Sequence, residues 1–354
     1  MEQKTLNLDK VQISINRLKE KRSKIYLFVQ DTKGNAKASV RYIYQMAMAL
    51  KNGGFNPIIV HEKSDYVGVG KWLGENYMTE IPHQTIENQN LEISPEDFLV
   101  IPEIFGFILA QTKNLPAGKI MLAQSYSAIL ETLQPGESWS QFGSTKCITT
   151  SLKQKEFIEK VMRGTSFDIL PPVISEVFQK SKKPAKTIIA VHTRDQRDTI
   201  NLIKTFYLKY PQYRWITFRD MRGLSELEFA NTLKDCCLSV WIDQESGLGT
   251  FPLESMRCGV PVIGKVPDLM PEWMSEENGV WIADKTMIVD FVSDFIQNWL
   301  EDNLNEDLFV KMEETSGKFT DMINFNKSVC ELFEDYLNKR AESFENQLKK
   351  LTNE

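Results

Sequence analysis

A glycine-rich turn followed by a carboxylate on a short helix is the part of the sequence best suited to chemistry. Gly247 and Gly249 allow a tight turn in which the backbone approaches a ligand closely, and Pro252 fits the first turn of a helix. Such a helix start presents unpaired N–H groups and a positive dipole end, which suit an anion such as a diphosphate. Glu254, one position beyond a core-facing Leu253, would look toward the loop and could accept hydrogen bonds from a diol such as a ribose.

The stretch from Glu245 to Ile263 resembles the signature of the glycosyltransferase group 1 family, which comprises retaining nucleotide-sugar enzymes of the GT-B fold. The residues that match the family pattern in order are Glu254, Met256, Gly259, Pro261, Val262 and Ile263. In the family the second Glu of the pattern typically holds the nucleotide ribose, and the resemblance implies this role for Glu254.

The first Glu of the family pattern contacts the donor sugar, and it aligns with Ser246 in this chain. Glu245 lies one residue earlier, so three readings stay open. Either Glu245 reaches in through a shifted turn, or Ser246 replaces it, or activity is weakened. The resemblance thus implies catalytic roles for Glu245 and Ser246. It also implies that the turn formed by Gly247, Leu248, Gly249 and Thr250 binds the donor.

Two arginines are further candidates for binding the donor diphosphate. Family members usually carry an Arg and a Lys after the first strand of the second domain, and here Arg194 and Arg197 follow the expected strand 187–191. A guanidinium can fork onto phosphate oxygens. The alternative is that both are solvated loop charges paired with Asp195 and Asp198. Arg219 could line the nucleotide base pocket or form a surface salt bridge.

In the first domain the candidates follow three expected strands. Gly34 lies in the loop after the strand 24–29, where the family has a loop facing the donor phosphates and the acceptor. Glu103 follows the strand 98–101, and Ser125 and Tyr126 follow the strand 119–123. These side chains could contact an acceptor or the donor sugar.

Short apolar runs alternate with helical patterns in two series, which predicts two doubly wound α/β domains. The first series has expected strands at 24–29, 57–60, 98–101, 119–123 and 146–150, and the second at 187–191, 213–218, 238–242, 260–263 and 279–282. A polar, breaker-rich stretch at 168–186 reads as the interdomain linker. We therefore expect an N-terminal Rossmann-like domain on the acceptor side at 1–170 and a donor-side domain at 171–318.

The last stretch is helical and charged, with an apolar face that includes Phe319, Phe325, Val329 and Tyr336. In the GT-B family the terminal helices cross back to the first domain, so the resemblance implies that residues 319–354 pack there. The implied fold class is α/β, a GT-B arrangement of two Rossmann-like domains facing a cleft. The ligand is expected in that cleft, at the carboxyl ends of the two sheets.

Composition excludes several function classes. The chain has 354 residues, of which 42% are hydrophobic, and a formal net charge of −6, which argues against a general nucleic-acid binder. No apolar run reaches the ~18–20 residues that span a bilayer, so we expect a cytoplasmic protein without a transmembrane segment, for which peripheral membrane contact stays open. Five cysteines without CxxC spacing read as reduced thiols, and three histidines without paired spacing argue against a protein-held metal.

Three functions fit these residues. The first is transfer of a sugar, with retention, from a nucleotide diphosphate sugar to a glycan, lipid-linked or protein acceptor in surface glycan, polysaccharide or glycoconjugate synthesis. No cofactor beyond this co-substrate is expected. The second is a catalytically silent GT-B protein that binds a nucleotide sugar or stabilises a partner, and the third is a nucleotide-sugar epimerase. The donor, the acceptor and the oligomeric state are not encoded in any motif.

Overall fold

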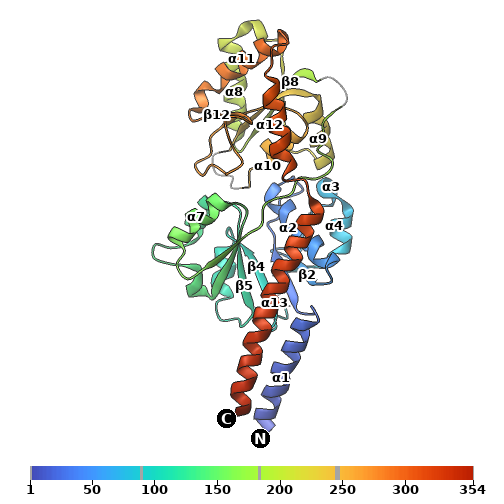
Figure 1. Cartoon of the computed structure of the whole chain (residues 1–354), viewed down its shortest axis with the longest axis vertical. Helices are drawn as coiled ribbons and strands as arrows, with labels where there is room; N and C mark the ends of the chain where they lie inside the picture. The colour runs from blue at the N-terminus through green and yellow to red at the C-terminus, as the bar shows by residue number, and fades with distance from the viewer. Residues whose placement is uncertain (1, 88–90, 182–184, 244–247, 354) are drawn as a thin grey trace. The chain divides into compact units, whose positions relative to one another are not determined.

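The chain forms two parallel β-sheets, each in its own unit, in the computed structural model (Figure 1). The structure describes residues 2–87, 91–181, 185–243 and 248–353. Unit 1 contains Met1–Thr150, Lys155–Leu170 and Ile323–Glu354, and unit 2 contains Ser151–Gln154 and Pro171–Met322. The predicted α/β class with two doubly wound domains is confirmed.

The sheet of unit 1 has the strand order β3-β2-β1-β4-β5-β6-β7, with every neighbouring pair parallel. Its strands are β1 (Lys24–Phe28), β2 (Asn56–His61), β3 (His83–Thr85), β4 (Phe98–Pro102), β5 (Gly118–Ala123), β6 (Ser144–Thr149) and β7 (Ser166–Ile169). The central strands are buried on both faces, which explains why they read as continuous apolar runs. The edge strands β3 and β7 were not predicted, because short and partly polar edge strands give no such run.

Helices cover both faces of this sheet. They are α1 (Glu2–Lys19), α2 (Ala38–Asn52), α3 (Gly70–Leu73), α4 (Glu75–Glu80), α5 (Gly106–Gln111), α6 (Tyr126–Thr132), α7 (Leu152–Val161) and α13 (Met322–Asn353). One core cluster of unit 1 includes Ile101, Met121 and Ile158, and it extends from the sheet to α5, α6 and α7.

The long helix α13 ends the chain and belongs to unit 1, as the predicted crossing implies. The ring of Phe325 packs edge-on against Tyr42 of α2 at 5.9 Å between centroids, and Tyr336 donates a hydrogen bond to the Asp168 carboxylate at 2.7 Å. The segment returns later than expected, however. Phe319 packs against a core cluster of unit 2, so the change of unit comes after Met322 and not at residue 319.

The sheet of unit 2 has the order β12-β11-β10-β8-β9, again all parallel. Its strands are β8 (Lys186–Thr193), β9 (Thr217–Asp220), β10 (Cys236–Ile242), β11 (Val262–Lys265) and β12 (Val280–Ile282), and its helices are α8 (Gln196–Lys209), α9 (Glu226–Asp235), α10 (Thr250–Arg257), α11 (Ile288–Leu300) and α12 (Glu306–Gly317). Two core clusters, one containing Trp241 and one containing Val240, cover its opposite faces. The strand expected at 213–218 is wrong in position, because Pro211–Tyr213 forms a 3₁₀ turn and β9 begins at Thr217.

Side-chain caps fix where two of these helices begin. The Asp195 carboxylate accepts the Arg197 N–H at the start of α8, and Ser225 and Glu228 form a reciprocal capping box at the start of α9. α10 begins differently, with Gly249 at its N-cap in the left-handed region. Among the described residues, no helix has both the length and the apolar character needed to cross a membrane.

Candidate functional site

Each sheet has one point at which the strand order changes direction, and ligands of open α/β sheets bind beside the carboxyl ends of the strands at that point. In unit 2 the chain runs from β8 to β9 on one side and then to β10 on the other, so the switch point lies between β8 and β10. In unit 1 it lies between β1 and β4. The two switch points define one candidate site in each unit.

The start of α10 lies at the switch point of unit 2, directly after β10. Gly249 has φ +53° and ψ +33°, and a Cβ added to it would come within 3.3 Å of the Trp273 ring, so both conformation and space favour glycine. Leu248 and Thr250 are buried on either side of it, and Glu254 in the same helix is only 4% exposed. The predicted candidates Glu245, Ser246 and Gly247 lie outside the described residues.

The predicted phosphate ligand Arg194 lies at this switch point. Its backbone N–H donates to the carbonyl of Ile242 at the end of β10 at 3.2 Å, and its guanidinium lies 3.7 Å from the Asp243 carboxylate. The side chain is 57% exposed, so it can turn toward an incoming anion. The carboxylate in this ion pair, Asp243, is not one of the two partners, Asp195 and Asp198, that the sequence suggested as an alternative.

Arg197 lies one residue into α8 and is exposed. The Asp195 carboxylate accepts its backbone N–H at 2.8 Å, and the other nearby acid, Asp198, pairs with Lys285 at 2.8 Å. The expected pairing of the Arg197 side chain with these two carboxylates is therefore not what the structure has.

His192, which sequence reasoning did not select, also occupies this switch point. Its ring stacks on Phe251 of α10, with centroids 4.8 Å apart and an angle of 17° between the planes. The ion pair between Asp220 and Arg222 lies at the end of the neighbouring strand β9. The predicted strand 213–218 ends before Arg219, so it placed Arg219 at the strand end. In the structure Arg219 lies within β9 and is exposed, and Asp220 and Arg222 occupy the strand end. The sequence signal for His192, Asp220 and Arg222 is that all three lie at, or just after, the carboxyl end of a parallel strand.

At the switch point of unit 1 the central residue is Glu103, directly after β4. Its Oε1 accepts the backbone N–H of Ser125 at 2.6 Å, while its Oε2 is buried and has no hydrogen-bond partner among the described residues. Burial raises the pKa of the Glu103 carboxyl to about 7, against hydrogen bonds from backbone N–H groups that act to lower it. The structure thus brings two predicted candidates together around a carboxyl group that titrates near neutral pH.

The other first-domain candidates surround this point. Tyr126 begins α6 and packs its ring edge-on against Phe157 of α7 at 5.4 Å, so its ring also serves the core. Gly34 has φ +79° in the loop after β1, next to Lys33 at φ +53°. A pocket of about 280 Å³ is lined by residues of this loop, among them Lys37, which donates to the Gln30 side chain at 2.7 Å. Sequence reasoning had not selected Lys37.

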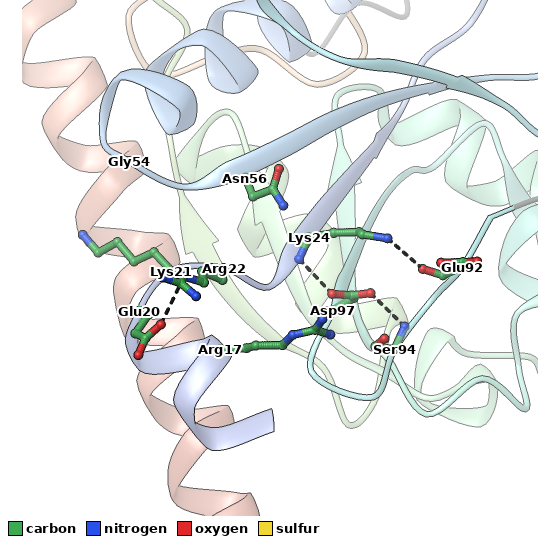
Figure 2. A pocket seen from close by; sticks show the side chains of 10 residues that line it. All are labelled: Arg17, Glu20, Lys21, Arg22, Lys24, Gly54, Asn56, Glu92, Ser94 and Asp97. Carbon is green, nitrogen blue, oxygen red and sulfur yellow. Dashed lines mark hydrogen bonds and ion pairs between the residues drawn. The ribbon is translucent and has the colours of Figure 1, made fainter. Parts of the chain in front are cut away.

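A larger pocket in unit 1, of about 610 Å³, lies at the opposite edge of the sheet, where β1, β2 and β4 begin (Figure 2). Figure 2 shows Lys24 between Glu92 and Asp97: its ammonium donates to the Glu92 carbonyl at 3.3 Å, and its backbone N–H donates to the Asp97 carboxylate at 2.8 Å. The remaining lining cations are also matched, Arg17 with Glu96, Lys21 with Glu334 and Arg22 with Glu20. Because each lining cation already has an acceptor, this pocket is not the candidate site.

Several solved structures share this fold of two α/β units. Sucrose-phosphate synthase from Thermosynechococcus elongatus aligns with a TM-score of 0.64 at 12% identity, covering 90% of this chain and 100% of that chain. TarM aligns with a TM-score of 0.65 at 10% identity, covering 88% of this chain and 98% of that chain. HepE from Anabaena, in complex with UDP, aligns with a TM-score of 0.60 at 9% identity, covering 88% of this chain and 100% of that chain. The chain has the GT-B fold.

At 9 to 12% identity these likenesses concern the GT-B fold itself and not the activity. Comparison with models of protein families gives no match, and comparison with curated proteins gives none either. Within the described ranges no group of three or more His, Cys, Asp or Glu side chains could hold a metal ion. In this GT-B chain one switch point brings together the predicted donor residues Arg194, Gly249, Thr250 and Glu254. The other brings together Glu103 and Ser125.

Proposed function

We propose that the chain is a glycosyltransferase that moves a sugar from a nucleotide diphosphate sugar to an acceptor hydroxyl, with retention of the anomeric configuration. The observation that carries the proposal is the start of α10, where left-handed Gly249, the positive end of the helix dipole and buried Glu254 coincide at a switch point. The solved structures of HepE and TarM in complex with UDP, which share the fold, add support.

On this proposal unit 2 holds the donor mainly by electrostatics. Arg194 or Arg197, the N–H groups of Gly249 and Thr250, and the dipole of α10 stabilise the negative charge that develops on the departing diphosphate. The carboxylate of Glu254 accepts hydrogen bonds from the ribose hydroxyls. The sugar contact is assigned to Glu245 or Ser246, which lie outside the described residues.

The acceptor is assigned to unit 1. Glu103, Ser125 and Tyr126 contact the acceptor or the transferred sugar, and the loop at Gly34 faces the donor phosphates. The acceptor is a glycan, lipid-linked or protein hydroxyl, used in the synthesis of a surface glycan, polysaccharide or glycoconjugate. The proposal assigns no resident metal or cofactor to this reaction.

Ligand-dependent stabilisation tests the donor site directly. We would measure thermal unfolding of the full chain with UDP, GDP, ADP, CMP and their sugar conjugates, because a ligand that binds only the folded state raises Tm. The proposal expects a selective rise with one nucleotide. Glu254→Gln should weaken that nucleotide about 10- to 100-fold, since hydrogen bonds to a charged acceptor contribute about 1.5–3 kcal/mol.

Glu313→Ala is the matched control, because Glu313 is an exposed carboxylate of α12 in the same unit. Its substitution should leave the nucleotide shift unchanged. No shift with any nucleotide would contradict the proposal, and so would a shift that Glu254→Gln leaves intact.

A catalytically silent nucleotide-sugar binder is the second candidate, and Ser246 at the position of the family's first Glu is the feature that favours it. Slow hydrolysis of the donor without an acceptor distinguishes the two functions. An active transferase should release sugar from the nucleotide that binds, whereas a silent protein should bind the same nucleotide and leave it intact.

A further inference from the structure

His192 sits within the switch point of unit 2 and touches α10 directly. It is the penultimate residue of β8 and pairs in register with Trp241 of β10. Besides stacking on Phe251, its ring meets Phe229 of α9 edge-on at 6.2 Å and 85°. The imidazole is therefore held in one orientation beside the first turn of α10, where the proposed donor site begins.

One ring nitrogen, Nδ1, is not used by the fold. Nδ1 is buried and has no hydrogen-bond partner among the described residues, although the residue as a whole is partly exposed. A buried nitrogen without a partner costs free energy that an apolar ring at this position would not cost. An unsatisfied imidazole that is both oriented by stacking and accessible therefore suits contact with a ligand.

The charged groups around the ring come from each strand and helix end that meets it. β9 contributes Asp220, and the residue after next, Arg222, neutralises that carboxylate through a bidentate pair. Asp243 follows β10 and Glu254 lies on α10, while α9 presents Phe229. The carboxylates favour the protonated ring, but burial outweighs them and lowers its pKa, with Arg222 acting in the same direction as burial. The ring is therefore neutral at pH 7 in the free protein.

We propose that His192 contacts the bound nucleotide sugar and takes up a proton as the diphosphate arrives. This inference rests on the proposed function and deepens it, because it makes donor binding by unit 2 dependent on pH. The ring lies beside the helix start to which the diphosphate is assigned. A doubly negative diphosphate at that position adds charge of the sign that favours imidazolium, and the cation then stabilises the bound donor.

The sign of the pH dependence follows from linkage. Binding raises the pKa of His192 above its value in the free protein, which is below 6.5. Between the free and the bound value each nucleotide brings up to one proton, so affinity rises as pH falls, by at most about tenfold per pH unit. Above the bound value the affinity no longer depends on this residue's charge.

Proton uptake can be measured by titration calorimetry of the full chain with UDP-glucose at pH 6.5, in two buffers of different ionisation enthalpy. The phosphates of this probe are both esterified and do not titrate near neutral pH, so they contribute no protons. The wild type should take up a substantial fraction of a proton. His192→Asn, which is polar but does not titrate there, should take up none and should lose the rise in affinity toward acid pH.

His83→Asn is the matched control, because burial and the neighbouring His61 lower the pKa of His83 to about 4, so it is already neutral at pH 6.5. It should leave proton uptake unchanged. His192→Phe keeps the stacking on Phe251, and it too should abolish uptake if it folds. The inference is overturned if the wild type binds without proton exchange, or if His192→Asn retains the uptake. If the wild type binds none of the nucleotide sugars in the thermal-shift panel, the proposed donor site is refuted, and this inference with it; if it binds one other than UDP-glucose, that nucleotide sugar replaces UDP-glucose in the titration.

Discussion

At the scale of single residues, environment and not residue type decides what the candidate groups can do. Glu103 and Glu96 are both glutamates of unit 1 with side chains that are almost fully buried. Glu103 is held by a backbone N–H, and its pKa rises. Burial alone would also raise the pKa of Glu96, but hydrogen bonds from Arg17 and Ser14 outweigh it and lower the pKa. The two carboxylates should therefore respond to pH in opposite ways.

Replacing Glu103 should change how stability depends on pH. Because the folded-state pKa is about 7, against an ordinary value of 4.5 for a glutamate, the folded protein holds a proton that the unfolded chain releases between these values. This group therefore lowers the free energy of unfolding by up to about 3 kcal/mol as pH rises from about 4.5 to about 7. Glu103→Gln should remove that loss of stability, so the free energy of unfolding of the variant should rise relative to that of the wild type as pH rises. Urea denaturation at pH 5 and pH 8 measures this difference.

Glu96→Gln should change the pH dependence of stability in the opposite direction, in the same unit. Its lowered pKa means that ionised Glu96 stabilises the fold above its unfolded-state pKa, and that this stability is lost as pH falls through the folded-state value. The variant should be destabilised at pH 8 and less so in acid. Equal pH profiles for the two variants would show that the burial of Glu103 does not control its protonation.

At the scale of elements, α13 contributes a large share of the unit 1 core although it lies at the far end of the sequence. Phe325, Val329, Phe333 and Tyr336 of this helix are all buried, and Phe333 and Val329 completely so. Arg340, seven residues after Phe333 and so on the same face of the helix, donates to the carbonyl of Pro95 at 2.9 Å. The helix is therefore part of the fold of unit 1, which is incomplete until α13 has been synthesised.

Phe333→Ala should destabilise unit 1 by about 3–5 kcal/mol, because it removes a fully buried ring and leaves a cavity. Ile323 of the same helix is 83% exposed, so Ile323→Ala should change stability by no more than about 0.5 kcal/mol. Hydrogen exchange of the amides in β1 and β2, read in both variants, separates the two outcomes. Equal protection in the two variants would mean that α13 does not support the sheet.

At the scale of the whole molecule, each unit carries its own hydrophobic core. The core clusters around Trp241 and Val240 draw their residues from between Ile174 and Phe319, within unit 2. Apart from the short segment Ser151–Gln154, unit 2 is one continuous stretch, whereas unit 1 needs the distant segment Ile323–Glu354. A nearly continuous unit with its own core can fold alone, whereas a unit made of distant segments needs them all.

Fragments test this difference. Residues 171–322 expressed alone should fold cooperatively and bind the same nucleotide as the full chain, measured by circular dichroism and thermal shift. Residues 1–170 alone should be poorly folded, and addition of residues 323–354 through a linker should restore cooperative melting. An unfolded 171–322 fragment, or a 1–170 fragment as stable as the linked one, would contradict the division.

Much of the fold could be predicted because parallel strands leave a strong local signal. The central strands β1, β4, β5 and β10 are buried on both faces, so each appears as an unbroken apolar run. The edge strands β3 and β7 escaped because an edge position needs neither burial nor apolar residues. β9 was misplaced because aromatic and apolar residues precede it, yet Tyr213 belongs to a 3₁₀ turn and Trp215 and Ile216 lie outside any strand.

The site divides in the same way. Local sequence determined the start of α10, since a left-handed Gly249 and a helix carrying Glu254 depend only on neighbouring residues. Only the tertiary structure brought His192 onto Phe251, or left Glu103 buried with one unsatisfied oxygen. Backbone conformation and helix starts are short-range properties, whereas burial, protonation and the meeting of strand ends depend on which distant segments pack together. The sequence by itself thus determined the elements and the kind of anion site that they can form, and packing decided which side chains titrate there.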